Sequence, residues 1–67
     1  MVNLKLNEIR ILESLAKSPK RPTDLSEELD INKPNMSNYL RYLEGIGYIW
    51  WIPGERNERI YHYKEGL

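Results

Sequence analysis

Between Lys33 and Arg41 the chain carries several side chains that can donate hydrogen bonds, and the first carboxylate after them is Glu44. Two of these side chains are cationic, two are amides and one is a hydroxyl. Groups of this kind can donate to phosphate oxygens and to the edges of bases. The residues proposed on this basis as nucleic-acid contacts are Lys33, Asn35, Ser37, Asn38 and Arg41.

A helix over residues 33–44 is predicted to present these donors. Asn32 is a suitable N-cap, because its side-chain oxygen can accept from an amide of the first turn, and Pro34 is tolerated there. Apolar residues recur at spacings of three and four and predict a stripe that faces a core, on the side opposite the donors. They are Met36, Tyr39, Leu40 and Leu43. The alternative interpretation of the donor side is an ordinary solvated helix surface.

A β-hairpin is predicted over residues 48–63. Gly45 and Gly47 are expected to end the preceding helix by allowing a left-handed residue, and aromatic and β-branched residues predict strands at 48–52 and 59–63. Residues 53–57 are rich in turn formers. The residues expected at the hairpin tip, where they could contact nucleic acid, are Arg56, Asn57 and Arg59. Because Glu55 and Glu58 alternate with them, the tip could instead be a self-neutralising loop.

Two shorter helices are predicted before residue 32. The first, over residues 7–17 with Asn7 as its cap, carries an apolar stripe of Ile9, Leu12, Leu15 and Ala16, with Ile11 beside it. Two prolines between residues 18 and 22 interrupt it, leaving a connection with room for a short extended piece beside the hairpin. The second helix, over residues 24–29, is expected to have Thr23 as its cap and to bury Leu25 and Leu29. Lys20 and Arg21 are weaker candidates for phosphate contact, because Asp24 lies nearby.

The stretch from Asn32 to Ile49 resembles the recognition helix and first wing strand of winged helix-turn-helix domains, as in MarR-like and ArsR-like transcriptional regulators. The resemblance rests on a capped helix that leaves through Leu-x-x-Leu-x-x-x-Gly, here Leu40, Leu43 and Gly47, and then enters a strand. It covers about residues 6–64. It implies one mainly α domain over residues 1–67, a three-helix winged helix-turn-helix with a small β-hairpin.

The resemblance also implies a function, which is sequence-specific binding of double-stranded DNA by a transcriptional regulator. The recognition helix would lie in the major groove, and the wing on the adjacent backbone or minor groove. Tyr42 is added to the candidate contacts, because its hydroxyl could reach a phosphate.

The overall charge is zero, since ten Lys and Arg residues balance ten Asp and Glu residues in 67 positions. A single domain so balanced should bind DNA weakly, because phosphate neutralisation supplies much of the affinity. We therefore predict a homodimer that doubles the contacts. The chain has no cysteine and no apolar run long enough for a membrane span, which predicts a cytoplasmic, nucleoid-associated protein without a membrane partner. No effector site is evident.

Other classes of function receive less support from the sequence. His62 is the single histidine and has no cysteine or carboxylate pair near it, so we expect no metal, no cofactor and no enzymatic activity. The main alternative is a winged-helix adaptor that binds proteins and not DNA. The zero net charge favours it, as do the adjacent Trp50 and Trp51, which must point to opposite faces of a strand, so that one remains exposed or contacts a partner.

Overall fold

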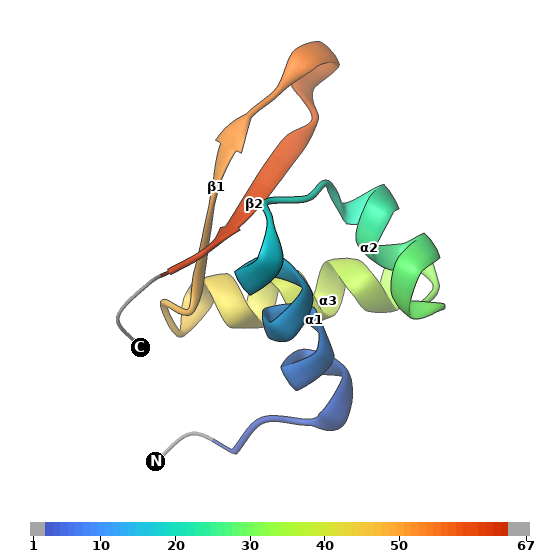
Figure 1. Ribbon diagram of the computed structural model, residues 1–67, viewed down its shortest axis with the longest axis vertical. Coiled ribbons are helices and arrows are strands. Elements are labelled where there is room, and N and C mark those ends of the chain that lie inside the picture. Colours follow the sequence, from blue (N-terminus) through green and yellow to red (C-terminus); the bar gives the residue numbers. More distant parts are fainter. Residues whose placement is uncertain (1–2, 65–67) are drawn as a thin grey trace.

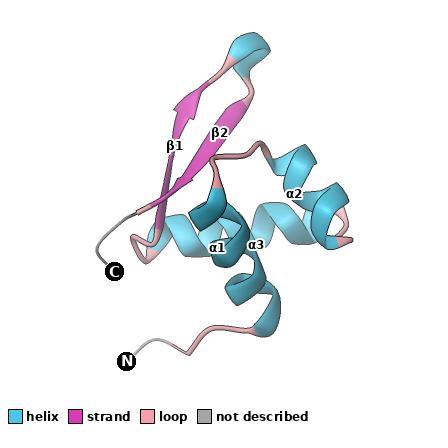
Figure 2. Ribbon diagram, viewed as in Figure 1, coloured by secondary structure: helices cyan, strands magenta, loops and turns pink. Residues whose placement is uncertain are grey.

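The computed structural model describes residues 3–64, which form three helices followed by an antiparallel hairpin (Figure 1). The elements are α1 (Leu6–Lys17), α2 (Pro22–Leu29), α3 (Lys33–Gly45), β1 (Ile49–Pro53), a 3-10 turn (Glu55–Asn57) and β2 (Arg59–Tyr63). The hairpin projects beyond the helices at one end of the molecule (Figure 2). The predicted fold class, three helices with a small hairpin, is confirmed.

The core lies where the three helices meet the base of the hairpin. Its centre consists of side chains that are almost entirely buried, namely Ile11, Leu25, Met36, Leu40 and Leu43. Ile31 in the turn between α2 and α3 is also buried, as are Ile49 of β1 and Tyr61 of β2. Each of the three helices and both strands therefore contributes to one apolar cluster, which fixes the direction of α3 relative to the hairpin.

The starts of α1 and α2 differ from the sequence prediction. The N-cap of α1 is Lys5 and not Asn7, because the carboxylate of Glu8 accepts the backbone N–H of Lys5 at 2.7 Å. The N-cap of α2 is Arg21 and not Thr23, and Pro22 is the first helical residue. A proline suits that position, since the first amide of a helix has no intrahelical partner.

The buried face of α1 also differs from the predicted stripe. Ile11 and Leu15 are buried, whereas Ile9 is 42% exposed and Ala16 is exposed. The helix carries two apolar stripes, and the core takes the one that contains Ile11. The other stripe lines a shallow hollow of about 340 Å³, with Glu13 at its edge. Its apolar lining consists of Leu4, Ile9, Leu12, Ala16, Tyr48 and Tyr63.

The end of α3 sets the start of the hairpin. Gly47 has φ +83°, whereas Gly45 is the last residue of the helix, so one of the two glycines takes the left-handed conformation. The backbone N–H of Tyr48 donates to Leu43 O at 3.0 Å, and the N–H of Gly47 donates to Glu44 O at 3.0 Å. This pair of bonds is the Schellman motif. The chain then enters β1, one residue later than predicted.

A short extended piece before α2 pairs with the hairpin. Lys20 and Tyr61 exchange backbone hydrogen bonds of 3.1 and 2.8 Å. The sequence had left room for such a piece between Pro19 and Pro22. Because β2 is held on one side by β1 and on the other by Lys20, the base of the hairpin is fixed against the helices.

Candidate nucleic-acid interface

The N-terminal cap fixes where α3 starts, and the buried residues that follow decide which side of the helix faces outward. The side-chain oxygen of Asn32 accepts the backbone N–H of Asn35 at 2.9 Å, as the sequence predicted. From this start, Met36, Leu40 and Leu43 are buried at spacings of three and four. The helix therefore turns its other side to solvent.

The donors proposed from the sequence all lie on that exposed side of α3. Exposed positions are Lys33, Asn35, Ser37, Asn38, Arg41 and Tyr42. No other part of residues 3–64 covers them. The neighbouring carboxylate, Glu44, accepts the indole N–H of Trp51 at 3.1 Å, so this acid is paired toward the hairpin. The outward side of α3 thus offers amides, a hydroxyl and cations to a ligand.

The tip of the wing presents two residues in a left-handed conformation. Arg56 has φ 55° and Asn57 has φ 64°, inside the 3-10 turn that joins the strands. Such angles are costly for an arginine, about 1–2 kcal/mol, and easier for an asparagine. Both side chains are exposed. The turn therefore carries an exposed cation at the end of the hairpin.

Arg59 does not lie at the tip, contrary to the sequence prediction. It is the first residue of β2, and its guanidinium lies over the Trp51 ring at 4.4 Å from the centroid. The same group donates to the Tyr61 hydroxyl at 3.2 Å. That hydrogen bond raises the pKa of Arg59, so the charge persists at any working pH. The side chain consequently faces α3 and not the far end of the wing.

Trp51 and Tyr61 are the site residues that sequence reasoning missed. They are directly opposite each other in the hairpin register, and Arg59 lies two residues before Tyr61. Residues two apart on a strand share a face, and opposite residues touch. The alternation of residues along the two strands could have placed Trp51, Arg59 and Tyr61 on one face of the hairpin. This inference required the length of the turn, which sets the register.

Lys20 and Arg21, the weaker candidates for phosphate contact, are engaged elsewhere. The Lys20 ammonium donates to the Ser14 carbonyl and hydroxyl at 2.7 and 2.8 Å. Arg21 forms ion pairs with Asp24 at 3.1 Å and with Glu58 of the wing at 3.0 Å. The hydrogen bond from Arg21 lowers the pKa of Asp24. The Lys20 side chain thus connects α1 and α2, and Arg21 connects the start of α2 to the wing. The outward side of α3 remains the main donor surface.

The two tryptophans lie on opposite faces of β1, as the alternation predicted. Trp51 is partly buried against the core, whereas Trp50 is 46% exposed and stacks on His62 with ring centroids 4.2 Å apart. Within residues 3–64, no three acidic or histidine side chains gather as metal ligands would. In the same part of the chain, none of the helices has the length and apolar character of a membrane span.

The sequence matches one known protein family. A family model described as bacterial regulatory protein, arsR family, matches residues 7–49. Searching the curated proteins with the sequence gave no match.

Two solved structures superpose closely on this chain. One is a mutant of ZitR from Lactococcus lactis, with a TM-score of 0.88, 20% identity and coverage of 96% of this chain. The other is FabT from Streptococcus pneumoniae in complex with DNA, with a TM-score of 0.85, 24% identity and coverage of 94%. At these identities the likeness concerns the fold. The chain spans less than half the length of either protein, 45% and 46% respectively.

Proposed function

Because this chain belongs to the arsR family of bacterial regulatory proteins, we propose that it binds double-stranded DNA and regulates transcription. The observation that carries the proposal is the exposed side of α3 over residues 33–43, which has no carboxylate before Glu44 and is bordered by the wing. A regulator of this kind acts on the chromosome, so the proposal includes a cytoplasmic, nucleoid-associated location. The complex of FabT with DNA supports it by analogy of fold.

The proposed docking places α3 in the major groove and the wing beside it. Asn35, Ser37 and Asn38 have side chains of the length and chemistry that read base edges. Lys33, Arg41 and Tyr42 are assigned to phosphates, which position the helix without reading sequence. The residues assigned to the wing contact are Arg56, Asn57 and Arg59. Arg56 at the tip suits the negative potential of a narrow minor groove.

Selection of bound sites from a random duplex library tests this function directly. The proposal predicts enrichment of a defined motif with two half-sites related by a twofold axis and centred about one helical turn apart. A library that remains unenriched after several rounds would contradict specific DNA binding.

Arg56→Gly separates the contribution of the tip to binding from its contribution to stability. Glycine relieves about 1–2 kcal/mol of left-handed strain but adds about 0.5–1 kcal/mol of unfolded-state freedom. The free energy of unfolding, measured by urea denaturation, should thus rise by about 0–1.5 kcal/mol. The dependence of duplex binding on salt should become shallower by about one unit per site, because one phosphate-neutralising charge is gone. Glu55→Gln at the same tip is the control and should not weaken binding.

The proposal includes a homodimer, for which the outward stripe of α1 offers a surface. Leu6 is 71% exposed, and Ile9, which is 42% exposed, lines the hollow together with Tyr48 and Tyr63. Apolar side chains grouped in this way favour burial against a partner. The surface is on α1, so two copies joined there would leave α3 of each uncovered. A second copy would also double the number of side chains that can contact phosphates.

Ile9→Glu should weaken the dimer more than tenfold, because it places a carboxylate in an apolar contact without a partner. Analytical ultracentrifugation over a range of concentrations measures the change. Ile52→Glu is a matched control, since Ile52 is also 42% exposed but lies on the wing. Equal dimerisation of Ile9→Glu and the parent protein would exclude this surface.

A protein-binding adaptor is the second candidate, favoured by the zero net charge and by the exposed Trp50. Salt distinguishes the two functions. Binding of DNA through several phosphates weakens steeply as salt rises, whereas an apolar protein interface barely responds. A flat salt dependence of the main interaction of the protein would favour the adaptor.

A further inference from the structure

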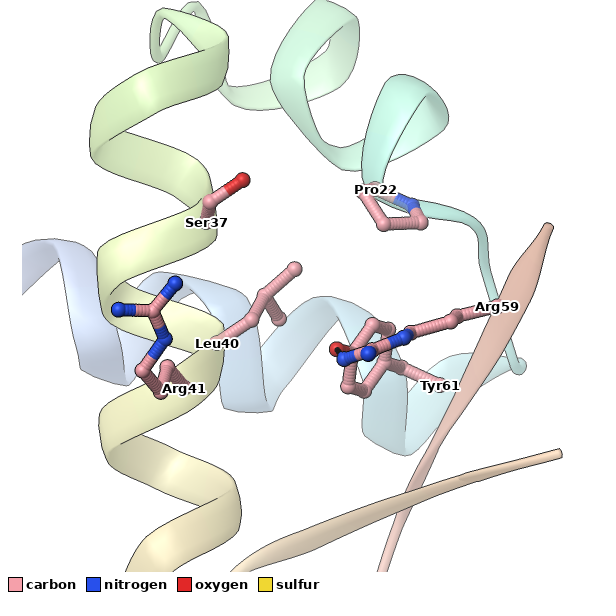
Figure 3. Close-up of a pocket in the computed structure, with 6 residues that line it drawn as sticks. All are labelled: Pro22, Ser37, Leu40, Arg41, Arg59 and Tyr61. Carbon is pink, nitrogen blue, oxygen red and sulfur yellow. Dashed lines mark hydrogen bonds between the residues drawn. The ribbon is translucent and has the colours of Figure 1, made fainter. Parts of the chain in front are cut away.

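A pocket of about 290 Å³ lies between the recognition helix and the wing, with two arginines on its walls (Figure 3). It is lined by Pro22, Ser37, Leu40, Arg41, Arg59 and Tyr61. In Figure 3, Arg41 extends from α3 on one side and Arg59 from β2 on the other, with Leu40 between them. None of the lining residues is acidic. We propose that this pocket binds a single phosphate group between the two guanidinium groups.

The size and lining of the pocket favour a small anion over an apolar ligand. Pockets for drug-sized molecules measure about 300–1,000 Å³ and are mostly apolar. This pocket is at the lower limit, and its walls carry two permanent positive charges and the Ser37 hydroxyl. Guanidinium groups bind phosphate oxygens through paired N–H donors, which gives charge and direction together. A phosphate is therefore the ligand that satisfies most of the lining groups.

Arg59 is already held in place for this role. Trp51 lies beneath its guanidinium at 4.4 Å, and the Tyr61 hydroxyl accepts one of its five N–H groups. Trp51 is itself fixed by the indole hydrogen bond to Glu44 at the end of α3. A long side chain fixed in this way loses less freedom when it binds a ligand. Trp51 is thus a positioning residue that connects α3, the wing and the proposed phosphate site.

The phosphate could come from two sources. One is a phosphodiester of the DNA backbone as it passes from the major groove to the wing, in which case the inference rests on the proposed function. The other is a free phosphate or phosphate monoester. The chemistry of the pocket is the same for both, so the experiment has an arm for each source.

The indole N–H of Trp51 is a reporter beside this site. We expect its ¹H–¹⁵N NMR signal to differ from that of Trp50, because the Trp51 indole donates to Glu44 whereas the Trp50 ring stacks on His62. The ¹⁵N-labelled protein is titrated with inorganic phosphate at constant ionic strength, and separately with a selected duplex whose binding is confirmed by fluorescence anisotropy. We expect the Trp51 signal to shift and the Trp50 signal to remain. Arg59→Met should weaken the phosphate response at least about tenfold, as loss of a charged hydrogen bond implies. Lys17→Met removes an exposed cation that does not line the pocket and belongs to neither α3 nor the wing, so it is the control and should respond as the parent does.

Each result has a defined meaning. A Trp51 shift with duplex alone supports the site and identifies the DNA backbone as the source. A shift with inorganic phosphate while the duplex fails to bind supports the site and contradicts the proposed function. If the duplex binds by anisotropy but Trp51 responds to neither ligand, the phosphate site is overturned and DNA binding stands. A phosphate response that persists in Arg59→Met would also overturn it.

Discussion

Replacing Asn38 and Arg41 together by alanine should weaken binding of the selected duplex about 100-fold or more. Loss of a base contact from Asn38 removes about 1–3 kcal/mol of discrimination. Loss of the Arg41 contact removes a charged hydrogen bond of about 1.5–3 kcal/mol and one phosphate neutralisation. In a homodimer both recognition helices carry the change. Fluorescence anisotropy at fixed salt measures the affinity.

The matched control for this pair is Asn3→Ala with Lys17→Ala, which also removes one exposed amide and one exposed cation, neither of them in α3 or the hairpin. Its affinity for the duplex should be within about threefold of that of the parent, because salt screens the effect of a charge that does not contact DNA. Both double variants should melt within a few degrees of the parent, because exposed substitutions have small effects on stability. Parent-like affinity of the Asn38 and Arg41 variant would remove α3 from the interface.

Ile11→Ala should have the largest effect on folding. The Ile11 side chain is fully buried among α1, α2 and α3, and removing it deletes apolar contacts and leaves a cavity, at a cost of about 2–5 kcal/mol. A domain of this length is stabilised by only about 3–10 kcal/mol. The substitution should lower the melting temperature by roughly 8–40 °C, because 1 kcal/mol corresponds to about 4–8 °C in a small domain. Circular dichroism during heating gives the shift.

Ile52→Ala is the control for burial, since it removes the same atoms from a side chain that is 42% exposed. We expect Ile52→Ala to lower the free energy of unfolding by less than about 1 kcal/mol, mostly because alanine favours a β-strand less than isoleucine does. Ile11→Val, which removes one methylene group, should fall between the two, at about 0.5–1.5 kcal/mol. Similar losses for Ile11→Ala and Ile52→Ala would show that the core is not where the structure places it.

The recognition helix could be predicted from the sequence because its determinants are local. Asn32 caps the turn that follows it, and Met36, Leu40 and Leu43 repeat at helical spacing, so the direction of the donors follows from residues within one segment. The Gly47 exit also depends on neighbours in the chain. Local hydrogen bonds and periodicity are the features that a sequence displays.

The surroundings of Arg59 could not be predicted in the same way. The predicted strand over residues 59–63 already included Arg59. The direction of its side chain, however, depends on the hairpin register and on a turn in which Arg56 and Asn57 both have positive φ. The bonds of Arg21 to Glu58 depend equally on tertiary packing.

The buried face of α1 could not be predicted from the sequence either. Two apolar stripes compete on that helix, and only the packing of α2 and α3 decides that Ile11 faces the core and Ile9 faces outward. Periodicity identifies an apolar stripe but does not say which of two adjacent stripes is covered.

Chemical-shift mapping with a selected duplex tests the central claim most directly, since a chain of 67 residues gives resolved amide spectra. If the outward side of α3 reads DNA, the largest shifts will fall on the backbone of residues 33–42 and on the side-chain amides of Asn35 and Asn38. The wing at residues 56–59 should follow, while the outward stripe of α1 should change little. Shifts concentrated on α1 or around Trp50, with α3 unchanged, would contradict the assignment and favour an adaptor.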